Sequence, residues 1–358
     1  MRAPRRLWRR SKEGSPFRLS PLIVALDDPA WGRFLDASPD ALPFHHCAWA
    51  SVVADCYGFH GFALVLVNER GEIVAGLPVV EISGPLSRRR WISLPFSDRC
   101  PPLLRTPALA SPLADALERA RSEHEVVSVE VRGPLGEPRL ALSLDALAVM
   151  HTRPLAQDPA LVFRTLREQA RRNVRVAERR GAKVRRTESR KELTETFYAL
   201  QVHTRKRHGL PVQPRRMFEL LWDRMLEHDL GFLLLAHVGR TPVAGAVFLA
   251  WNRTVTFKYG ASLPEYWTYR PNDLLFWTAI KWGCANGFQT FDFGRTDAPN
   301  SGLRRFKNGW GVEEPLIYSA LGKPQRAARP HRVTSALIRH APPWLVRLSG
   351  ELLYRYAA

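Results

Sequence analysis

The stretch TFDFGRTDAPNSGLRRFKNGWG, residues 290–311, says most about the fold and function of this chain. Its first four residues alternate polar and aromatic side chains, which is typical of a β-strand, and Gly294 marks the end of that strand. A polar loop and a short basic run follow, and Lys307 stands between aromatic residues. Because several cations come within a few residues of a strand end, we expect this segment to meet an anionic group.

Four further segments precede it in the chain: WISLPFSDRCPPLL (91–104), ARRNVRVAERRGAKV (170–184), FYALQVHTRKRHGLPVQP (197–214) and YRPNDLLFWTAIKWGCANGF (269–288). Together with residues 290–311, and in this order, they resemble the FemA/FemB-type transferases of the GNAT superfamily of N-acyltransferases. The resemblance covers most of residues 160–320. It implies an enzyme that moves an aminoacyl or acyl group onto an amine.

Composition limits the possible classes of protein. A chain of 358 residues with 45% hydrophobic content can bury a large core, as one large domain or two ordinary ones. No window reaches about 18 consecutive apolar residues, and the basic N-terminus has no apolar stretch behind it, so we expect a cytoplasmic protein. The four cysteines lack zinc-site spacing, so we expect buried free thiols and no metal or redox cofactor.

The net charge of +19 is unevenly distributed. Residues 1–12 carry six basic side chains and no acidic one, and residues 323–358 carry seven basic side chains against Glu351. Residues 164–180 contain seven arginines. Basic ends and one basic helix fit tRNA, anionic lipid or a pyrophosphate-bearing substrate equally well.

Two segments share a pattern: FALVLVNERGEIVAGLPVVEI from Phe62 and FLLLAHVGRTPVAGAVFLAW from Phe232. Each predicts a hairpin of an apolar strand, a turn with glycine, and a second strand that begins Val-Ala-Gly. The repeat indicates two similar halves with a cleft between them. We therefore expect an α/β (α+β) fold of tandem GNAT-like half-domains, each with a mixed, mostly antiparallel central sheet flanked by helices.

The predicted organisation has four parts: a basic N-terminal tail (1–16), a first GNAT-like half (17–150), a second GNAT-like half with the catalytic motif (151–322), and a basic amphipathic C-terminal tail (323–358). A connecting segment is expected near 151–159, and one helix from Asp158-Pro159 to Gly181. The C-terminal tail is either a membrane-surface helix or a segment that packs on the protein's own body. Further predicted elements are helices at 43–57, 110–123, after 194, 215–228 and 272–286, and strands at 230–236, 243–251, 254–262 and 290–293.

Acyl transfer to an amine requires proton removal from the nucleophile and stabilisation of an oxyanion. Lys307 matches the lysine of the family's Phe-Lys motif, and the resemblance places it near the reacting carbonyl or a donor phosphate. Asp292 points away from Phe291 and Phe293 in its strand. It could accept the amine proton or orient a cation, and a structural salt-bridging aspartate is the alternative.

The other candidates bind substrate or donor. Arg205 ends a helix, where a cation is favourable even without ligand, and family members hold a nucleotide-linked or lipid-linked sugar through basic residues of the corresponding helix. Tyr259 could donate a hydrogen bond from its strand. The substrate-binding candidates are Arg205, Tyr259, Arg295, Arg171 and Arg172, and the donor-binding candidates are Arg270, Asn272, Asp273 and Arg304.

The donor is predicted from the turn before one helix. Acyl-CoA users of the superfamily cradle pyrophosphate with a glycine-rich turn whose N–H groups face the phosphates. Here the turn reads YRPNDLL, with no glycine, and Pro271 has no N–H. This departure slightly favours aminoacyl-tRNA over acyl-CoA as donor.

The sequence thus predicts an N-acyltransferase acting on an amine of a cell-envelope, peptidoglycan or exopolysaccharide precursor. One alternative is an acyl-CoA-dependent GNAT N-acetyltransferase. Another is a non-catalytic GNAT-like module that binds an anionic precursor, tRNA or membrane. The expected partners are an anionic small-molecule or lipid-linked precursor and tRNA, with peripheral contact at the inner face of an anionic membrane.

Overall fold

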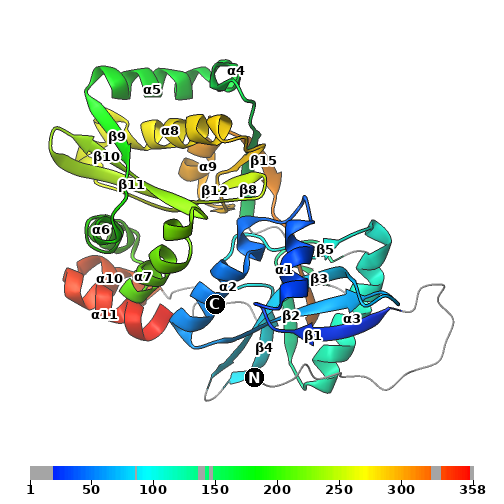
Figure 1. The fold of residues 1–358 in the computed structure, drawn as a ribbon. Helices are drawn as coiled ribbons and strands as arrows, with labels where there is room; N and C mark the ends of the chain where they lie inside the picture. Colours follow the sequence, from blue (N-terminus) through cyan, green and yellow to red (C-terminus); the bar gives the residue numbers. More distant parts are fainter. Residues whose placement is uncertain (1–18, 85–86, 136–141, 145–147, 324–331, 355–358) are drawn as a thin grey trace. The chain divides into compact units, whose positions relative to one another are not determined.

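The computed structural model describes residues 19–84, 87–135, 142–144, 148–323 and 332–354. The chain divides into two compact units: unit 1 comprises residues 1–147 and 316–326, and unit 2 comprises residues 148–315 and 327–358. Each unit contains one sheet with helices packed against it (Figure 1). The predicted N-terminal tail, residues 1–16, lies outside the described residues.

Unit 1 is built on a sheet with the order β1-β2-β3-β4-β6-β16-β7, in which β5 also pairs with β3. The β4–β6 pair is parallel and the other ladders are antiparallel. Its elements are β1 (Ser20–Val24), α1 (Pro29–Asp36), η1 (Pro43–His45), α2 (Cys47–Tyr57), β2 (His60–Val67), β3 (Ile73–Gly84), β4 (Ser87–Ile92), β5 (Leu103–Leu104), η2 (Pro107–Leu109), α3 (Ala110–Glu123), β6 (Ser128–Val131), β7 (Leu142–Leu144) and β16 (Tyr318–Gly322).

Unit 2 is built on a sheet with the order β14-β8-β13-β12-β11-β10-β9, in which β15 also pairs with β8. Here the parallel pair is β12–β13. Its elements are β8 (Ala148–Pro154), α4 (Pro159–Thr165), α5 (Glu168–Arg179), β9 (Ala182–Arg186), η3 (Glu192–Phe197), α6 (Tyr198–His208), α7 (Arg215–Arg224), η4 (Leu226–His228), β10 (Gly231–Val238), β11 (Thr241–Trp251), β12 (Thr254–Ser262), η5 (Pro264–Tyr269), α8 (Pro271–Ala285), β13 (Thr290–Asp292), β14 (Thr296–Asp297), α9 (Ser301–Lys307), β15 (Val312–Pro315), α10 (Arg332–His340) and α11 (Pro343–Leu353).

The two sheets follow one plan. Four antiparallel strands are followed by a helix, then a strand parallel to the fourth, then a strand antiparallel to that one. In unit 2 the last position is filled by β8, which precedes the other strands, and in unit 1 by β16, which comes after unit 2 in the chain. The predicted fold class, tandem GNAT-like halves with mixed, mostly antiparallel sheets, is confirmed.

The expected connecting segment at 151–159 is wrong over its first part, because residues 151–154 belong to β8. The run His-Thr-Arg looks like a loop in the sequence, but β8 pairs with β13, β14 and β15, and this pairing buries His151 completely. The structure also differs from the predicted domain limits in returning residues 316–326 to unit 1.

The single helix predicted from Asp158 to Gly181 begins as expected, because the Asp158 carboxylate accepts a hydrogen bond from the Ala160 amide at 2.8 Å. It then breaks into α4 and α5, since Leu166 and Arg167 have extended backbones. Leu166 turns into the core, and the Arg167 amide bonds to the Gly309 carbonyl at 3.3 Å. Tertiary contacts therefore interrupt the predicted helix at these two residues.

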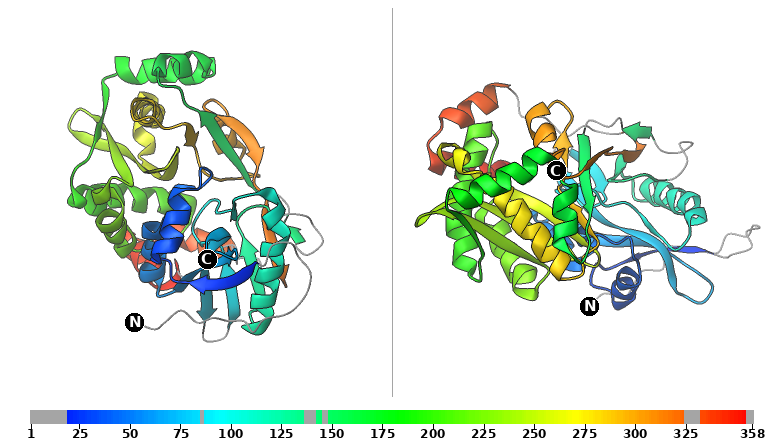
Figure 2. Two further views of the ribbon diagram at one scale, coloured as in Figure 1. Left: turned by 45° about the vertical axis from the view of Figure 1, so that its right-hand side comes forward. Right: turned by 90° about the horizontal axis from the view of Figure 1, so that it is seen from above.

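Unit 2 has layers on both faces of its sheet. Helices α5 and α8 lie side by side on one face, where the core includes Val174, Ala177, Phe232 and Phe248 (Figure 2). Helix α6 contacts β11 and β12 on the other face, and α10 and α11 pack against α6. Ile338 and Val346 are buried in that packing, so the described part of the C-terminal tail packs partly on the protein's own body.

The repeated Val-Ala-Gly has a packing reason. A Cβ at Gly76 would lie 2.9 Å from the Leu64 carbonyl oxygen and 3.0 Å from the Trp31 ring. A Cβ at Gly245 would lie 2.8 Å from the Phe197 ring. In both units the absent side chain lets an aromatic ring from a helix lie directly on the second strand of the hairpin.

Two of the cysteines differ from expectation. Cys100 and Cys284 are buried, but Cys47 and Cys56 are half-buried, because they lie on the flank of α2 that does not face the core. All four are free thiols.

We expect Gly76→Ala to lower the free energy of unfolding by about 1–3 kcal/mol, because the new methyl group meets a fixed backbone oxygen and a buried indole. Chemical denaturation measures this. Gly32→Ala in α1 is the matched control: nothing lies within 4 Å of its added Cβ, so the change should stabilise by about 0.5–1 kcal/mol. Equal effects of the two substitutions would contradict this account of the repeat.

Candidate active site

The sheet of unit 2 opens where β12 and β13 separate. These parallel strands pair at only three positions, from Thr254 with Thr290 to Thr256 with Asp292. β13 then ends, while β12 continues to Ser262 with β11 as its partner, and no other described strand pairs with residues 257–262. A register shift leaves Lys258 as an extra residue in β12. The opened edge offers backbone donors and acceptors to an extended ligand.

The end of β13 is fixed by Asp292, whose side chain is 0% exposed. Its Oδ1 accepts a hydrogen bond from the Gly294 amide at 2.8 Å. Gly294 has φ +71°, a conformation that favours glycine, so the chain turns sharply away from β12. Phe291 and Phe293 enter the hydrophobic core, as the alternation predicted.

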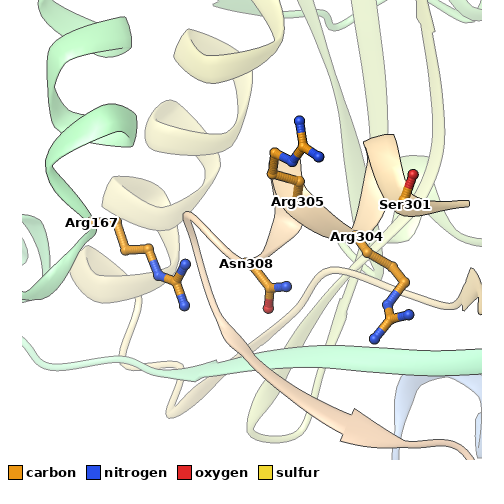
Figure 3. A pocket seen from close by; sticks show the side chains of 5 residues that line it. All are labelled: Arg167, Ser301, Arg304, Arg305 and Asn308. Atoms are coloured by element: carbon orange, nitrogen blue, oxygen red, sulfur yellow. The ribbon is translucent and has the colours of Figure 1, made fainter.

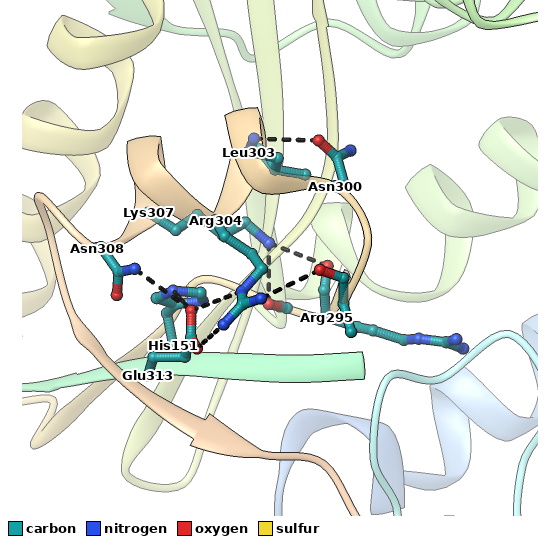
Figure 4. Close-up of polar contacts among 10 residues, drawn as sticks. His151, Arg295, Asn300, Leu303, Arg304, Lys307, Asn308 and Glu313 are labelled. Carbon is teal, nitrogen blue, oxygen red and sulfur yellow. Dashed lines mark hydrogen bonds and ion pairs between the residues drawn. The ribbon is translucent and has the colours of Figure 1, made fainter. Parts of the chain in front are cut away.

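Lys307 ends α9 and is only 2% exposed. Its Nζ donates hydrogen bonds to the carbonyl oxygens of Gly294 at 2.9 Å and Arg295 at 3.0 Å (Figure 4). The same ammonium group lies 6.0 Å from the centre of the Phe257 ring. A buried cation is therefore held at the turn where β13 leaves β12.

The predicted donor turn lies at the start of α8. Asp273 is 4% exposed, and its Oδ1 accepts a hydrogen bond from Asn173 Nδ2 of α5 at 3.2 Å. Burial raises the pKa of Asp273 to about 6. Arg270 has φ +54° and an exposed side chain, and Asn272 Nδ2 donates to Ser262 Oγ at 3.3 Å. The structure thus brings Asn272 to the end of β12 and Asp273 to α5.

Residues 164–308 match the family model described as an acetyltransferase (GNAT) domain. Unit 2 contains a GNAT acetyltransferase domain. Over these residues the predicted resemblance to the GNAT superfamily is confirmed. A comparison with curated protein sequences finds no match.

Solved structures share the fold over most of the chain. The crystal structure of FemX matches with a TM-score of 0.66 and 15% identity, over 84% of this chain and 96% of FemX. L-PGS from Bacillus licheniformis matches with a TM-score of 0.51 and 13% identity, over 88% of this chain and 97% of L-PGS. The C-terminal domain assigned to a lysylphosphatidylglycerol synthetase of Agrobacterium fabrum matches with a TM-score of 0.51 and 11% identity, over 81% and 90%. These likenesses concern the fold, and that with FemX agrees with the FemA/FemB-type resemblance.

Sequence reasoning missed His151 and Glu313 of the unit 2 sheet. They face each other in the β8–β15 ladder, and His151 Nε2 lies 3.3 Å from Glu313 Oε2. Burial, and then the positive charge of Lys307, lower the pKa of His151 below its usual value, although Glu313 acts in the opposite direction. Glu313 also holds the Arg304 guanidinium through both of its oxygens (Figure 4). The strands are about 160 residues apart in the chain, so no sequence signal joined these residues.

Other predicted site residues make separate contacts. Arg205 Nε donates to the Pro211 carbonyl at 2.9 Å, and its guanidinium lies 5.9 Å from the centre of the Tyr354 ring. The neighbouring Arg207 reaches the end of β12 instead, because its Nη1 donates to the Ser262 carbonyl at 3.1 Å. Tyr259 is nearly buried and packs edge-on against Phe218.

The remaining arginine candidates lie elsewhere. Arg295 Nη2 bonds to Asp297 Oδ1 at 2.9 Å. Arg171 Nη1 donates to the Arg164 carbonyl at 3.5 Å, and Arg172 is exposed. Within the part of the chain that the structure describes, Arg304 bonds to Glu313 and the Ala298 carbonyl, and it does not join the turn at residues 270–273. Among the described residues no group of His, Cys, Asp or Glu side chains is placed to hold a metal ion.

Asp273→Asn tests the electrostatics at the start of α8. The pKa of the Asp273 carboxyl is about 6 when folded, against 3.8 as its ordinary value, so its contribution to stability is full below pH 3.8 and is lost as pH rises through 6. Asparagine does not titrate. From pH 4 to pH 7, the unfolding free energy of the variant should therefore rise relative to wild type by about 2 kcal/mol.

Urea denaturation at the two pH values measures this difference. Asp297→Asn, which changes an exposed carboxylate, is the control and should show no comparable trend. Parallel pH dependence of wild type and Asp273→Asn would show that Asp273 is not buried as a perturbed acid.

Proposed function

We propose that this protein is an N-acyltransferase that moves an aminoacyl group onto an amine of a cell-envelope or exopolysaccharide precursor. The single observation that carries the proposal is the buried ammonium group of Lys307 at the opening between β12 and β13 of a GNAT domain. An acyl carbonyl placed in that opening would develop negative charge beside a preorganised cation, which is the arrangement that stabilises a tetrahedral intermediate.

In this proposal Lys307 is the catalytic residue, and Asp292 is a positioning residue. Asp292 holds the Gly294 amide, which fixes one of the two carbonyls that receive the Lys307 ammonium. The attacking amine must lose a proton, and a neutral base is needed near the cation. His151 has the neutral charge that such a base needs, because burial and the positive charge of Lys307 hold its pKa below the usual value.

The donor turn favours aminoacyl-tRNA over acyl-CoA. A pyrophosphate at the start of α8 would need several free backbone N–H groups, and Pro271 has none. The buried Asp273 carboxylate accepts a hydrogen bond from its own amide and is largely ionised at pH 7, since its pKa is about 6. An ionised carboxylate at the start of α8 would repel a phosphate, so the residues fit a CoA pyrophosphate poorly.

Two named relatives support an aminoacyl donor and an anionic acceptor. The name lysylphosphatidylglycerol synthetase refers to a product with an aminoacyl group on an anionic lipid. The fold of this chain also matches FemX over most of its length. The net charge of +19 suits both a tRNA donor and a nucleotide-linked or lipid-linked acceptor. We place the reaction in the cytoplasm, at the inner face of the membrane.

Lys307→Met tests the catalytic assignment. Transfer of a radiolabelled aminoacyl group from tRNA to an extracted pool of envelope precursors should fall by about 10²–10³-fold, because the oxyanion loses its cation. Anisotropy at about 150 mM salt should show tRNA binding within about threefold of wild type. Lys307→Arg keeps the charge and should retain part of the transfer.

Thermal unfolding with CoA and acetyl-CoA is the control for the donor assignment. A ligand at a hundredfold its dissociation constant adds about 2.7 kcal/mol to stability, which is easily detected. Stabilisation by CoA without salt-resistant tRNA binding would overturn the donor assignment and make the protein an acyl-CoA-dependent N-acetyltransferase. The non-catalytic binding module would be favoured by two results together. Lys307→Met would leave transfer or the cellular phenotype unchanged, and removal of residues 323–358 would abolish it.

We also propose that α10 and α11 contact an anionic membrane surface. While Ile338 and Val346 face α6, the outer side exposes large apolar side chains, with Leu337 67% and Trp344 64% exposed. Leu345 and Leu348 are exposed beside them, and Arg339 and Arg347 are exposed on the same two helices. An apolar face with tryptophan and flanking arginines suits the interface of an anionic bilayer. Among the described residues, no helix is both long and apolar enough to cross a membrane.

Trp344→Ser combined with Leu348→Ser should reduce pelleting with anionic vesicles at least about fivefold, because two interfacial anchors are lost. Zwitterionic vesicles should bind the wild type weakly. Leu161→Ser with Val312→Ser removes two exposed apolar side chains elsewhere in unit 2 and is the control. Equal loss of vesicle binding in the two double variants, or no vesicle binding by wild type, would contradict a membrane role for this face.

A further inference from the structure

A surface pocket of about 270 Å³ lies between the start of α5 and α9 in unit 2. Its lining is basic and polar: Arg167, Ser301, Arg304, Arg305 and Asn308 (Figure 3). Figure 3 shows the Arg167 side chain extending from the α5 end toward Asn308, while Arg304 and Arg305 leave adjacent positions of α9. The chemistry described for the donor turn and Lys307 uses neither Arg167 nor Arg305.

The charge of this pocket is positive after its internal ion pair is counted. Glu313 binds Arg304 through both oxygens, and Asn308 Nδ2 donates to Glu313 Oε2 at 3.3 Å. The side chains of Arg167 and Arg305 make no hydrogen bond or ion pair with any part of the chain that the structure describes. Two guanidinium groups therefore face the pocket without a protein carboxylate, which leaves an excess of two positive charges.

The two walls of the pocket are held together. The Arg167 amide donates to the Gly309 carbonyl at 3.3 Å, and a Cβ at Gly309 would lie 3.7 Å from the Ala170 side chain. The α9 wall is anchored in the core by Lys307. Because the backbones that carry the arginines are fixed relative to each other, the cations need little reorganisation to meet a ligand.

This pocket is separate from the donor turn. Arg167 precedes α5, whereas Arg180 follows it and donates to the carbonyl of Thr268, just before Arg270. Asp273 of that turn bonds to Asn173, six residues beyond Arg167, so at 1.5 Å per residue the turn begins about 9 Å along α5 from the pocket and extends to the far end of α5, about 18 Å away. One phosphate group cannot occupy both ends, so the two regions would bind different groups.

We propose that the pocket is an anion subsite for a phosphate monoester or diphosphate group. Paired guanidinium groups present forked N–H donors that match phosphate oxygens, and an excess of two positive charges matches the charge of such a group. The volume accommodates a diphosphate but not the nucleoside attached to it, which would lie outside. The assignment of this group to the acceptor precursor rests on the proposed function, whereas anion binding itself does not.

Calorimetric titration of the full chain with inorganic pyrophosphate at about 150 mM salt tests the subsite. Arg167→Ala with Arg305→Ala should raise the dissociation constant at least tenfold. Arg175→Ala with Arg179→Ala removes the same charge from α5 outside the pocket and should change it less than twofold. Arg167→Lys with Arg305→Lys keeps the charge but removes the paired N–H donors of the guanidinium groups. Its dissociation constant should therefore lie between those of wild type and the Arg167→Ala, Arg305→Ala variant.

The outcomes separate this proposal from the proposed function. No binding of millimolar pyrophosphate by wild type, or equal weakening by both alanine pairs, would overturn the subsite. A third result would also overturn the subsite and assign the pocket to the tRNA donor. In it, the wild type binds a short RNA oligonucleotide but not pyrophosphate, and Arg167→Ala with Arg305→Ala abolishes the RNA binding. Failure of acyl transfer from tRNA leaves the pyrophosphate result standing, since that titration needs no donor. A nucleoside diphosphate that binds tighter than pyrophosphate would identify a nucleotide-linked ligand.

Discussion

A buried ammonium group constrains the arrangement of unit 2. An unpaired charge inside a protein costs several kcal/mol, so the chain must bring acceptors to Lys307. It does so with two consecutive carbonyls, those of Gly294 and Arg295, which point to one place only because the chain turns at a positive φ directly after β13. The same turn ends the pairing with β12. The opening in the sheet and the cation beside it are therefore consequences of one local conformation.

Local patterns in the sequence were sufficient for most of the elements. The apolar strands around Gly76 and Gly245, the cap at Asp158 and the glycine after β13 each reflect short-range chemistry, and the structure has them where they were predicted. The GNAT assignment followed from motifs in order and was confirmed by the match at residues 164–308. Lys307 was found through such a motif, although its burial was not foreseen.

What could not be predicted depends on pairing between distant segments. His151 looked like a linker residue because its neighbours are polar, and only the β8–β15 ladder places it opposite Glu313. The break at Leu166 results from a side chain that enters the core, which helix periodicity cannot reveal. The arginine-rich helix shows the same limit: its seven arginines look alike in sequence, but the structure places Arg167 beside α9 and Arg180 beside η5.

The exchange of last strands between the two sheets has a consequence during synthesis. The sheet of unit 2 is complete once β15 has been made, at residue 315, whereas the sheet of unit 1 lacks β16 between β6 and β7 until residue 322. Domains usually fold in the order in which they leave the ribosome. Here the unit that begins first cannot close its sheet until the other has been synthesised, so a nascent chain exposes the edge of β6 throughout that interval. A ribosome that stalls within the acyltransferase half would therefore leave the amino-terminal half aggregation-prone.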